Sequence, residues 1–307
     1  MTLTLSDIHR VAIIGSGTLG LRVGLQCALS GFDTTLYDVN AAALTQARQT
    51  QQRILQGLIK HRRVTEQEAK AAIDRIAWTA DPTVAAKDAD FVNESVTEDV
   101  ELKKKVWADF GPRCPERAVL TTNTSYLLPS MFAQASGRPE RFCAFHFHDV
   151  FTANVVDIMP HPGTEEGVVD FLKQLGVALK QTPIVLQRES PGYVFNAMLM
   201  ALLGAAGALV TYDVASIHDV DRAWMGNFKM NRGPFGILDT VGLDTAWHIV
   251  KARSDEKSQR FAHLLRTYVE QGKLGVKSGE GFYTYPNPAF EQAGFVQGLK
   301  EIVGYEN

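Results

Sequence analysis

The chain has 307 residues, of which 45% are hydrophobic and 21% charged, and its formal net charge at pH 7 is −3. This composition excludes a disordered or fibrous chain, and the charge gives no bulk attraction to nucleic acid or to an anionic membrane. A chain of this length predicts two domains.

The N-terminal sequence and the cysteines favour a cytoplasmic protein. The first residues, MTLTLSDIHR, lack the basic and apolar regions of a secretory signal. The three cysteines, Cys27, Cys114 and Cys143, are far apart and odd in number. This argues against a disulfide framework and against a zinc or redox pair.

Apolar runs alternate with helical patterns up to residue 190, as expected of a parallel sheet wrapped by helices. The predicted fold class is therefore α/β, with a doubly wound sheet. Residues 41–73 predict one or two long polar helices, and residues 164–176 predict a helix with Thr164 as its N-cap. The predicted strands cover residues 11–14, 34–37, 91–94, 118–122, 142–147, 155–159 and 184–186.

A glycine-rich loop, Gly-Ser-Gly-Thr-Leu-Gly at residues 15–20, follows the first strand and begins a helix. In this motif the first glycine permits a tight turn, the second lets the backbone approach a pyrophosphate, and the third lets helix and strand pack closely. The N-terminus of the helix then faces the anion. The predicted pyrophosphate contacts are Gly15, Gly17, Thr18, Leu19 and Gly20.

Asp38 ends the second strand. A carboxylate at this position binds a ribose hydroxyl and repels a 2′-phosphate, so we predict NAD rather than NADP as the cofactor. The first domain, residues 1–189, is accordingly predicted to be an NAD-binding domain of the Rossmann type. An ordinary glycine turn that binds no nucleotide is the alternative.

Strand patterns end near Ser190, and residues 190–307 predict an all-α C-terminal domain. Residues 193–212 predict an apolar helix, which we interpret as buried in a core rather than as a membrane span. Another helix begins at Ser216, and residues 238–250 and 259–269 also have helical spacing.

Five segments of the chain resemble the 3-hydroxyacyl-CoA dehydrogenase family. This resemblance implies hydride transfer between NAD and the 3-hydroxyl of a 3-hydroxyacyl-CoA, such as 3-hydroxybutyryl-CoA, by an enzyme of fatty acid metabolism. It also implies that the helical domain contributes to substrate binding and forms a homodimer. The segments are the glycine loop, residues 93–98 (NESVTE) with Lys103, residues 122–125 (TNTS), residues 190–196 (SPGYVFN), and residues 233–244 with 277–283.

His146 matches the catalytic base of the family. Alternation along the predicted strand puts it on one face with Ala144 and His148. Its ordinary pKa near neutrality suits the removal of a hydroxyl proton. Asp157 stands where the family has the glutamate that orients the base. Its side chain is one methylene shorter, and its spacing from His146 is one residue shorter than in the family.

The resemblance implies roles for five other residues. Ser125 and Asn196 match polar groups that contact the substrate oxygen and stabilise negative charge on it. Together with His146 and Asp157, they are the predicted catalytic residues. Glu98 and Lys103 match residues that line the nicotinamide ribose, and Asn123 is expected beside the nicotinamide.

The residues at the positions that contact CoA in the family are different in this chain. A serine and a lysine that contact CoA in the family correspond here to Ile54 and His61. Lys60, Arg62 and Arg63 could supply positive charge to CoA phosphates. A free 3-hydroxy acid, such as a sugar acid or a carnitine-like compound, therefore stays open as an alternative substrate.

Other classes of function remain alternatives. A metal-dependent hydrolase would use histidines and aspartates as ligands, although the glycine loop and the resemblance predict no metal. A nucleophilic cysteine would pair Cys143 with His146, but these two side chains lie on opposite faces of the strand. A catalytically inactive NAD-binding dimer would explain the altered spacing. The candidate metal ligands are His146, His148, Asp149, Asp157 and His161.

Overall fold

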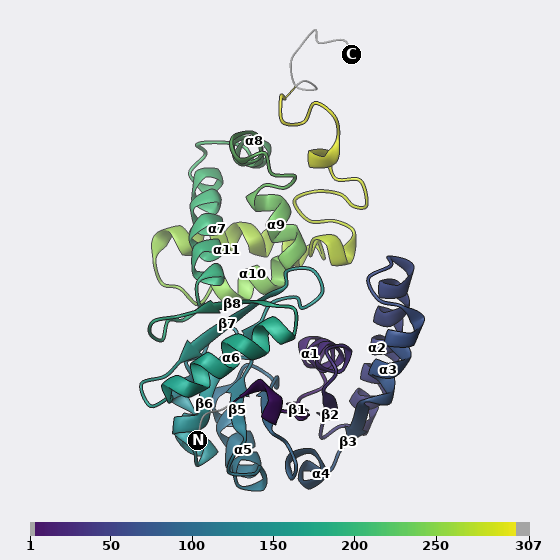
Figure 1. The fold of residues 1–307 in the computed structure, drawn as a ribbon. Coiled ribbons are helices and arrows are strands. Elements are labelled where there is room, and N and C mark those ends of the chain that lie inside the picture. The colour runs from purple at the N-terminus through teal and green to yellow at the C-terminus, as the bar shows by residue number, and fades with distance from the viewer. Residues whose placement is uncertain (1–3, 299–307) are drawn as a thin grey trace. The chain divides into compact units, whose positions relative to one another are not determined.

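The computed structural model describes residues 4–298 and divides the chain into two units, one up to Phe195 and one from Asn196. The first unit consists of a sheet with helices on both sides, and the second consists of helices and loops (Figure 1). The boundary predicted from the sequence, between residues 189 and 190, stays a prediction.

The first unit contains an eight-stranded sheet in the order β3-β2-β1-β4-β5-β6-β7-β8. Neighbouring strands are parallel except β6 and β7, which are antiparallel. The predicted α/β class and doubly wound sheet are confirmed. The strands are β1 (Arg10–Ile14), β2 (Asp33–Tyr37), β3 (Ile76–Thr79), β4 (Phe91–Glu94), β5 (Val119–Thr122), β6 (Phe142–Phe147), β7 (Val155–Pro160) and β8 (Thr182–Val185).

The helices of the first unit confirm one prediction and correct another. The polar segment at 41–73 forms two helices, within the one or two predicted, but Thr164 is not an N-cap, because Glu165 occupies that position. The Thr164 hydroxyl instead accepts from the backbone N–H of His161 and donates to the carbonyl of Phe142. The helices are α1 (Thr18–Leu29), α2 (Ala41–Lys60), α3 (Glu66–Asp74), α4 (Pro82–Ala86), α5 (Val100–Phe110) and α6 (Glu166–Ala178).

Alternate residues of the central strands enter two separate cores. On β1, Val11 and Ile13 pack with α1 and α6, whereas Ala12 and Ile14 pack with α4 and α5. Because helices cover both faces, central strands such as β4 and β5 are buried along their whole length. The chain leaves β1 for one side of the sheet and β4 for the other. Ligands bind at this switch point in folds of this kind.

The second unit is helical, as predicted, and no strand follows β8 within residues 4–298. The predicted helix at 238–250 is two helices, because Gly242 adopts a φ of 97° between them and ends the first. The helices are α7 (Phe195–Thr211), α8 (Ile217–Phe228), α9 (Pro234–Val241), α10 (Leu243–Val250) and α11 (Glu256–Glu270).

The apolar helix α7 is not buried, contrary to the prediction. Its buried residues are Leu203, Ala206 and Gly207, while Met198 and Leu209 are exposed. The sequence is apolar on nearly every side of this helix, but only one narrow side enters the core of the chain. None of the helices within residues 4–298 has the length and apolar character needed to cross a membrane.

Candidate active site

The glycine loop joins β1 to α1, and each glycine has its own reason to lack a side chain. Gly15 has a φ of +101°, and a Cβ there would lie 2.7 Å from the carbonyl oxygen of Ser95. A Cβ on Gly20 would lie 2.0 Å from the oxygen of Gly15. A Cβ on Gly17 would meet nothing within 4 Å. The space beside Gly17, next to Thr18 and Leu19 in the first turn of α1, therefore fits an approaching pyrophosphate.

Asp38 follows β2 and is held against this loop. Its Oδ2 accepts from the backbone N–H of Ser16 at 2.9 Å and from the Ser16 hydroxyl at 2.8 Å. Its Oδ1 accepts from the backbone N–H of Asn40 at 3.0 Å. The carboxylate is half-buried, so it is fixed by the fold and still accessible to a ribose. Sequence reasoning had not identified Ser16.

His146 and Asp157 face each other across β6 and β7. They are directly paired in the register of the two strands, and Nδ1 of His146 lies 3.0 Å from Oδ2 of Asp157. Their side chains are 4% and 1% exposed. An imidazole that donates from Nδ1 to a carboxylate keeps Nε2 as its basic nitrogen. The shorter aspartate side chain reaches the histidine because the two residues are direct neighbours across the strands.

Burial and hydrogen bonding act in opposite directions on this pair. Burial lowers the pKa of His146 below its ordinary value, although the hydrogen bond to Asp157 opposes this shift. Burial alone would raise the pKa of Asp157, but hydrogen bonds from His146 and His148 outweigh it, and the pKa is lowered. The pair is therefore a neutral imidazole beside a carboxylate at neutral pH.

Tyr193 fixes the plane of the His146 ring. The two rings are stacked, with centroids 4.6 Å apart and an interplanar angle of 20°. The Tyr193 hydroxyl donates to the carbonyl oxygen of Thr124 at 2.6 Å. The residue has a φ of +54° directly after Gly192. Tyr193 lies inside the segment 190–196 that carries the resemblance, but nothing in the sequence indicated that it packs on the histidine.

Glu98 organises the loop that carries Ser125. Its Oε1 accepts from the backbone N–H groups of Ser125 at 3.0 Å and Tyr126 at 2.9 Å, and from the hydroxyl of Thr124. The side chain of Ser125 is exposed. Glu98 and Ser125 are thus brought together, and the Ser125 hydroxyl stays free to meet a ligand.

Lys103 lies deeper than the prediction implied. Its side chain is 1% exposed, and Nζ donates to Oε1 of Glu94 at 2.6 Å. The nearest oxygen of Glu98 is 3.7 Å from Nζ. Glu94, at the carboxyl end of β4, was missed by sequence reasoning, although it stands in the NESVTE segment. Lys103 therefore connects α5 to the end of β4 and neutralises the buried Glu94.

Asn123 joins the ends of three neighbouring strands. Its Oδ1 accepts from the backbone N–H of Phe147 at 2.8 Å, and its Nδ2 donates to the hydroxyl of Ser95 at 3.1 Å. The side-chain amide is thus engaged within the protein. Asn196 lies in the first turn of α7 in the second unit, and its place beside the substrate stays a proposal.

The residues of the metal-site hypothesis do not assemble as a set of five. His161 pairs with the carbonyl of Pro139, and Asp149 forms an ion pair with Arg22. The other three residues have donor atoms within 4.8 Å of one another, and they are His146, His148 and Asp157. Cys143 is fully buried in the core on the opposite face, and burial raises the pKa of its thiol strongly. This argues against a nucleophilic cysteine.

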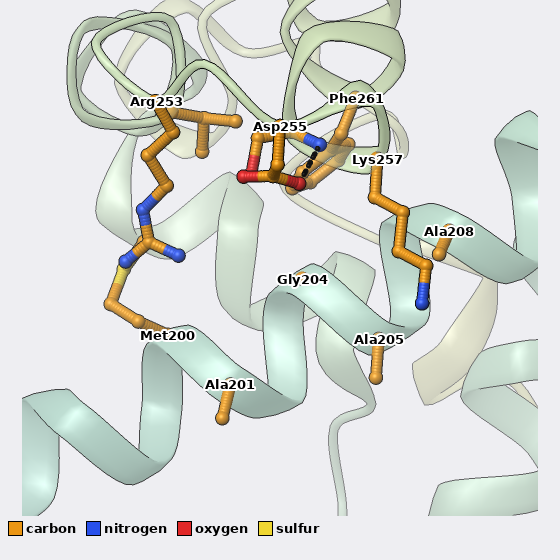
Figure 2. Close-up of a pocket in the computed structure, with 11 residues that line it drawn as sticks. Met200, Ala201, Gly204, Ala205, Ala208, Arg253, Asp255, Lys257 and Phe261 are labelled. Carbon is orange, nitrogen blue, oxygen red and sulfur yellow. Dashed lines mark hydrogen bonds between the residues drawn. The ribbon is translucent and has the colours of Figure 1, made fainter.

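A separate hollow lies on the second unit, and none of the predicted site residues lines it. The small residues Gly204 and Ala205 of α7 form one wall, and Arg253, Asp255 and Lys257 form the other (Figure 2). Asp255 caps α11 by accepting from the backbone N–H of Ser258. The hollow contains none of the groups needed for hydride transfer.

Comparison with known families accounts for most of the chain. Residues 10–190 match the domain described as "3-hydroxyacyl-CoA dehydrogenase, NAD binding domain". Residues 192–285 match "3-hydroxyacyl-CoA dehydrogenase, C-terminal domain".

Relatives and solved structures cover nearly the full length. A probable 3-hydroxyacyl-CoA dehydrogenase of Caenorhabditis elegans is 30% identical over 92% of this chain and 97% of its own length. A probable 3-hydroxybutyryl-CoA dehydrogenase of Bacillus subtilis is 29% identical over 91% and 98%. A diketoreductase structure with a TM-score of 0.86 is 35% identical and covers 91% of this chain and 99% of its own. The (S)-3-hydroxybutyryl-CoA dehydrogenase of Ralstonia eutropha has a TM-score of 0.82 and 28% identity over 91% and 100%.

Proposed function

Because this chain belongs to the 3-hydroxyacyl-CoA dehydrogenase family and carries its NAD-binding domain, we propose that it oxidises the 3-hydroxyl of a 3-hydroxyacyl-CoA, such as 3-hydroxybutyryl-CoA, to the 3-ketone. The reverse reaction reduces the ketone. The observation that carries this proposal is the buried pair of His146 and Asp157 on β6 and β7, in the same sheet as β1, the strand that the glycine loop follows.

His146 is the proposed base. In the oxidation direction its Nε2 accepts the proton of the substrate hydroxyl, while Asp157 holds Nδ1–H and stabilises the imidazolium that forms. The hydrogen on the same carbon leaves with its electron pair, and the nicotinamide of bound NAD supplies the hydride acceptor. Ser125 and Asn196 are proposed to donate hydrogen bonds to the substrate oxygen, which favours the charge that develops there during reduction.

The residues present fit the cofactor. Gly17, Thr18 and Leu19 border the open space at the start of α1, and Asp38 lies against the same loop. We propose that this loop binds the pyrophosphate and that Asp38 binds a ribose. Glu98, Lys103 and Asn123 are proposed near the nicotinamide. Because Lys103 and Asn123 are engaged with protein groups, their proposed contribution is to shape this part of the site.

A second candidate is the reduction of carbonyl compounds that carry no CoA. The structural neighbour named a diketoreductase favours it. Arg63, one of the cations considered for CoA phosphates, donates to the carbonyl of Phe151 at 2.5 Å and is thus used within the protein. The intact pair of His146 and Asp157 makes a catalytically inactive NAD-binding dimer less favourable.

A direct assay separates these functions. NADH consumption is followed by its absorbance with acetoacetyl-CoA and, separately, with acetoacetate and larger free dicarbonyl compounds. We expect kcat/KM to be at least about tenfold higher with acetoacetyl-CoA, because tenfold corresponds to only about 1.4 kcal/mol of binding energy from the CoA portion. Turnover of free compounds alone would replace the first candidate with the second. His146→Gln protein is the control for background oxidation.

The assembly and location are also proposals. The exposed apolar side chains of α7, among them Met198 and Leu209, favour a homodimer formed through the helical domain. The three free, buried cysteines fit a reducing compartment such as the cytoplasm. We keep residues 1–189 as the proposed NAD-binding domain and residues 190–307 as the proposed substrate and dimerisation domain.

A further inference from the structure

Asp157 is shared between two histidines. Its Oδ2 lies 3.0 Å from Nδ1 of His146 and 2.9 Å from Nε2 of His148. The two imidazole rings are 4.8 Å apart between centroids. The side chain of His148 is 13% exposed, so all three groups are shielded from bulk water. His146 and Asp157 therefore form a hydrogen-bonded cluster of three side chains with His148.

The backbone pairing of β6 with β7 determines where the two histidines lie relative to Asp157. His146 and His148 are two positions apart and so point to the same face. The backbone N–H of His148 bonds to the carbonyl of Val155 at 3.1 Å, which continues the pairing of β6 with β7 beyond the last residue of β6. His148 is thereby fixed relative to Asp157 by the sheet itself.

We propose, building on the function proposed above, that His148 is a positioning residue that acts through Asp157. It holds the carboxylate in place and limits how strongly Asp157 stabilises the protonated form of His146. A carboxylate oxygen has two lone pairs, and here each of the two imidazole N–H groups occupies one. The negative charge that Asp157 offers to His146 is therefore divided.

The other groups around His146 do not duplicate this effect. Asp157 and Glu98 favour its protonated form, whereas burial and His148 disfavour it. Tyr193, stacked on the ring, is neutral because burial raises its pKa well above the ordinary value. Among the groups that act on His146, His148 is the one that competes with it for the carboxylate of Asp157.

The neighbours of His148 leave Asp157 as its acidic partner. The His148 ring makes an edge-to-face contact with Phe195, with centroids 5.5 Å apart. The adjacent carboxylate of Asp149 forms an ion pair with Arg22 at 3.1 Å and accepts from the backbone N–H of Phe151. Asp149 is thus occupied elsewhere.

Removal of His148 should therefore raise the pKa of His146. With one donor gone, Asp157 gives its whole charge to His146 and stabilises the imidazolium. Oxidation needs the neutral imidazole, so the acid limb of the kcat/KM profile should move to higher pH by roughly half a unit to one unit. Reduction needs the protonated imidazole, so the alkaline limb of the kcat/KM profile for reduction should also move to higher pH.

The test compares three variants of His148. His148→Phe and His148→Leu remove the donor with two different shapes, and His148→Gln keeps an amide N–H that can reach Asp157. We measure the pH profile of kcat/KM for oxidation of 3-hydroxybutyryl-CoA by NAD. In the same proteins without substrate, NMR of labelled imidazole nitrogens follows the titration of His146. His146→Gln protein assigns its resonances.

We expect both donor-free variants to raise the midpoint in both measurements and the glutamine variant to stay within about 0.3 units of the wild type. A fall in kcat with an unchanged midpoint would show that His148 only supports the fold, and would overturn the proposal. If no 3-hydroxyacyl-CoA is oxidised, the proposed function fails. The NMR titration then still decides the role of His148, since it needs no substrate.

Discussion

At the scale of single residues, the proposed chemistry depends on Nε2 of His146. We predict that His146→Gln lowers kcat by about a hundredfold or more, which is the contribution expected of a general base. The Kd for NADH should change little, because the ring lies at β6 and not in the glycine loop. Steady-state kinetics and NADH fluorescence titration measure the two effects.

His161→Gln is the matched control for this prediction. His161 is also buried, but it pairs with the backbone of Pro139 rather than with a carboxylate. We expect its kcat per folded molecule to stay within about twofold of the wild type, as for a residue with no part in proton transfer. Near-normal turnover in His146→Gln would remove His146 from the mechanism.

The pH dependence follows from the lowered pKa of His146. Oxidation requires the neutral form, so kcat/KM for oxidation should rise with pH and reach its plateau with a midpoint below about 6.5, the ordinary value for histidine. Reduction requires the protonated form and should lose activity as pH rises through the same midpoint. A midpoint clearly above 6.5 in the oxidation profile would contradict the burial argument.

Asp38 decides between the two nicotinamide cofactors. We predict that Asp38→Asn lowers the ratio of kcat/KM for NAD to that for NADP by about tenfold or more, because it removes a charged hydrogen-bond acceptor for the ribose and its repulsion of a 2′-phosphate. Asparagine keeps an oxygen that can accept from Ser16, so the loop should remain folded. A wild-type enzyme that already prefers NADP would refute this assignment.

At the scale of elements, two glycines of the glycine loop are expected to serve different purposes: Gly20 serves the fold, and Gly17 serves cofactor binding. Gly20→Ala should lower the Tm, because its Cβ would lie 2.0 Å from the oxygen of Gly15 and helix α1 would have to move. Gly17→Ala should fold with a nearly unchanged Tm, because its Cβ meets nothing within 4 Å, and yet weaken NADH binding by about tenfold or more through the lost approach of the pyrophosphate.

Thermal unfolding and NADH titration of both variants test this contrast. Equal losses of Tm in Gly17→Ala and Gly20→Ala would show that both glycines serve the fold alone. Unchanged NADH affinity in Gly17→Ala would remove this face of the loop from the cofactor site.

The elements also show where sequence reasoning succeeds. Strands buried on both faces, such as β4 and β6, begin with apolar runs and were predicted with their observed bounds. β3 was missed, because Ile76–Thr79 is a strand of four residues at the edge of the sheet with only one of them buried. Thr164 was assigned to a helix cap because its type suits that position, yet a tertiary hydrogen bond to Phe142 determines its place.

The residues of the candidate site were predictable only in part. The family resemblance indicated His146, and alternation along the predicted strand placed His148 on the same face. The sharing of Asp157 by both histidines could not be derived, because it depends on the register between β6 and β7. The contact of Tyr193 depends on a φ of +54° that no residue pattern indicates.

At the scale of the whole molecule, the exposed side of α7 is the feature that a single chain leaves unexplained. Met198 is 61% exposed and Leu209 is 41% exposed. They are eleven positions apart, close to three helical turns, and therefore lie on one side of the helix. Large apolar side chains gathered on one face are typical of a protein interface. We therefore expect wild-type protein to be a dimer in solution.

Met198→Glu should convert this dimer to a monomer or weaken its association by about a hundredfold or more, because a charge would be buried without a partner. Val177→Glu is the matched control, since Val177 is 64% exposed on α6 in the first unit, where no interface is proposed. Analytical ultracentrifugation over a range of concentrations measures both. If Met198→Glu sediments as the wild type does, α7 is not the dimer surface. A monomeric wild type would contradict the dimer itself.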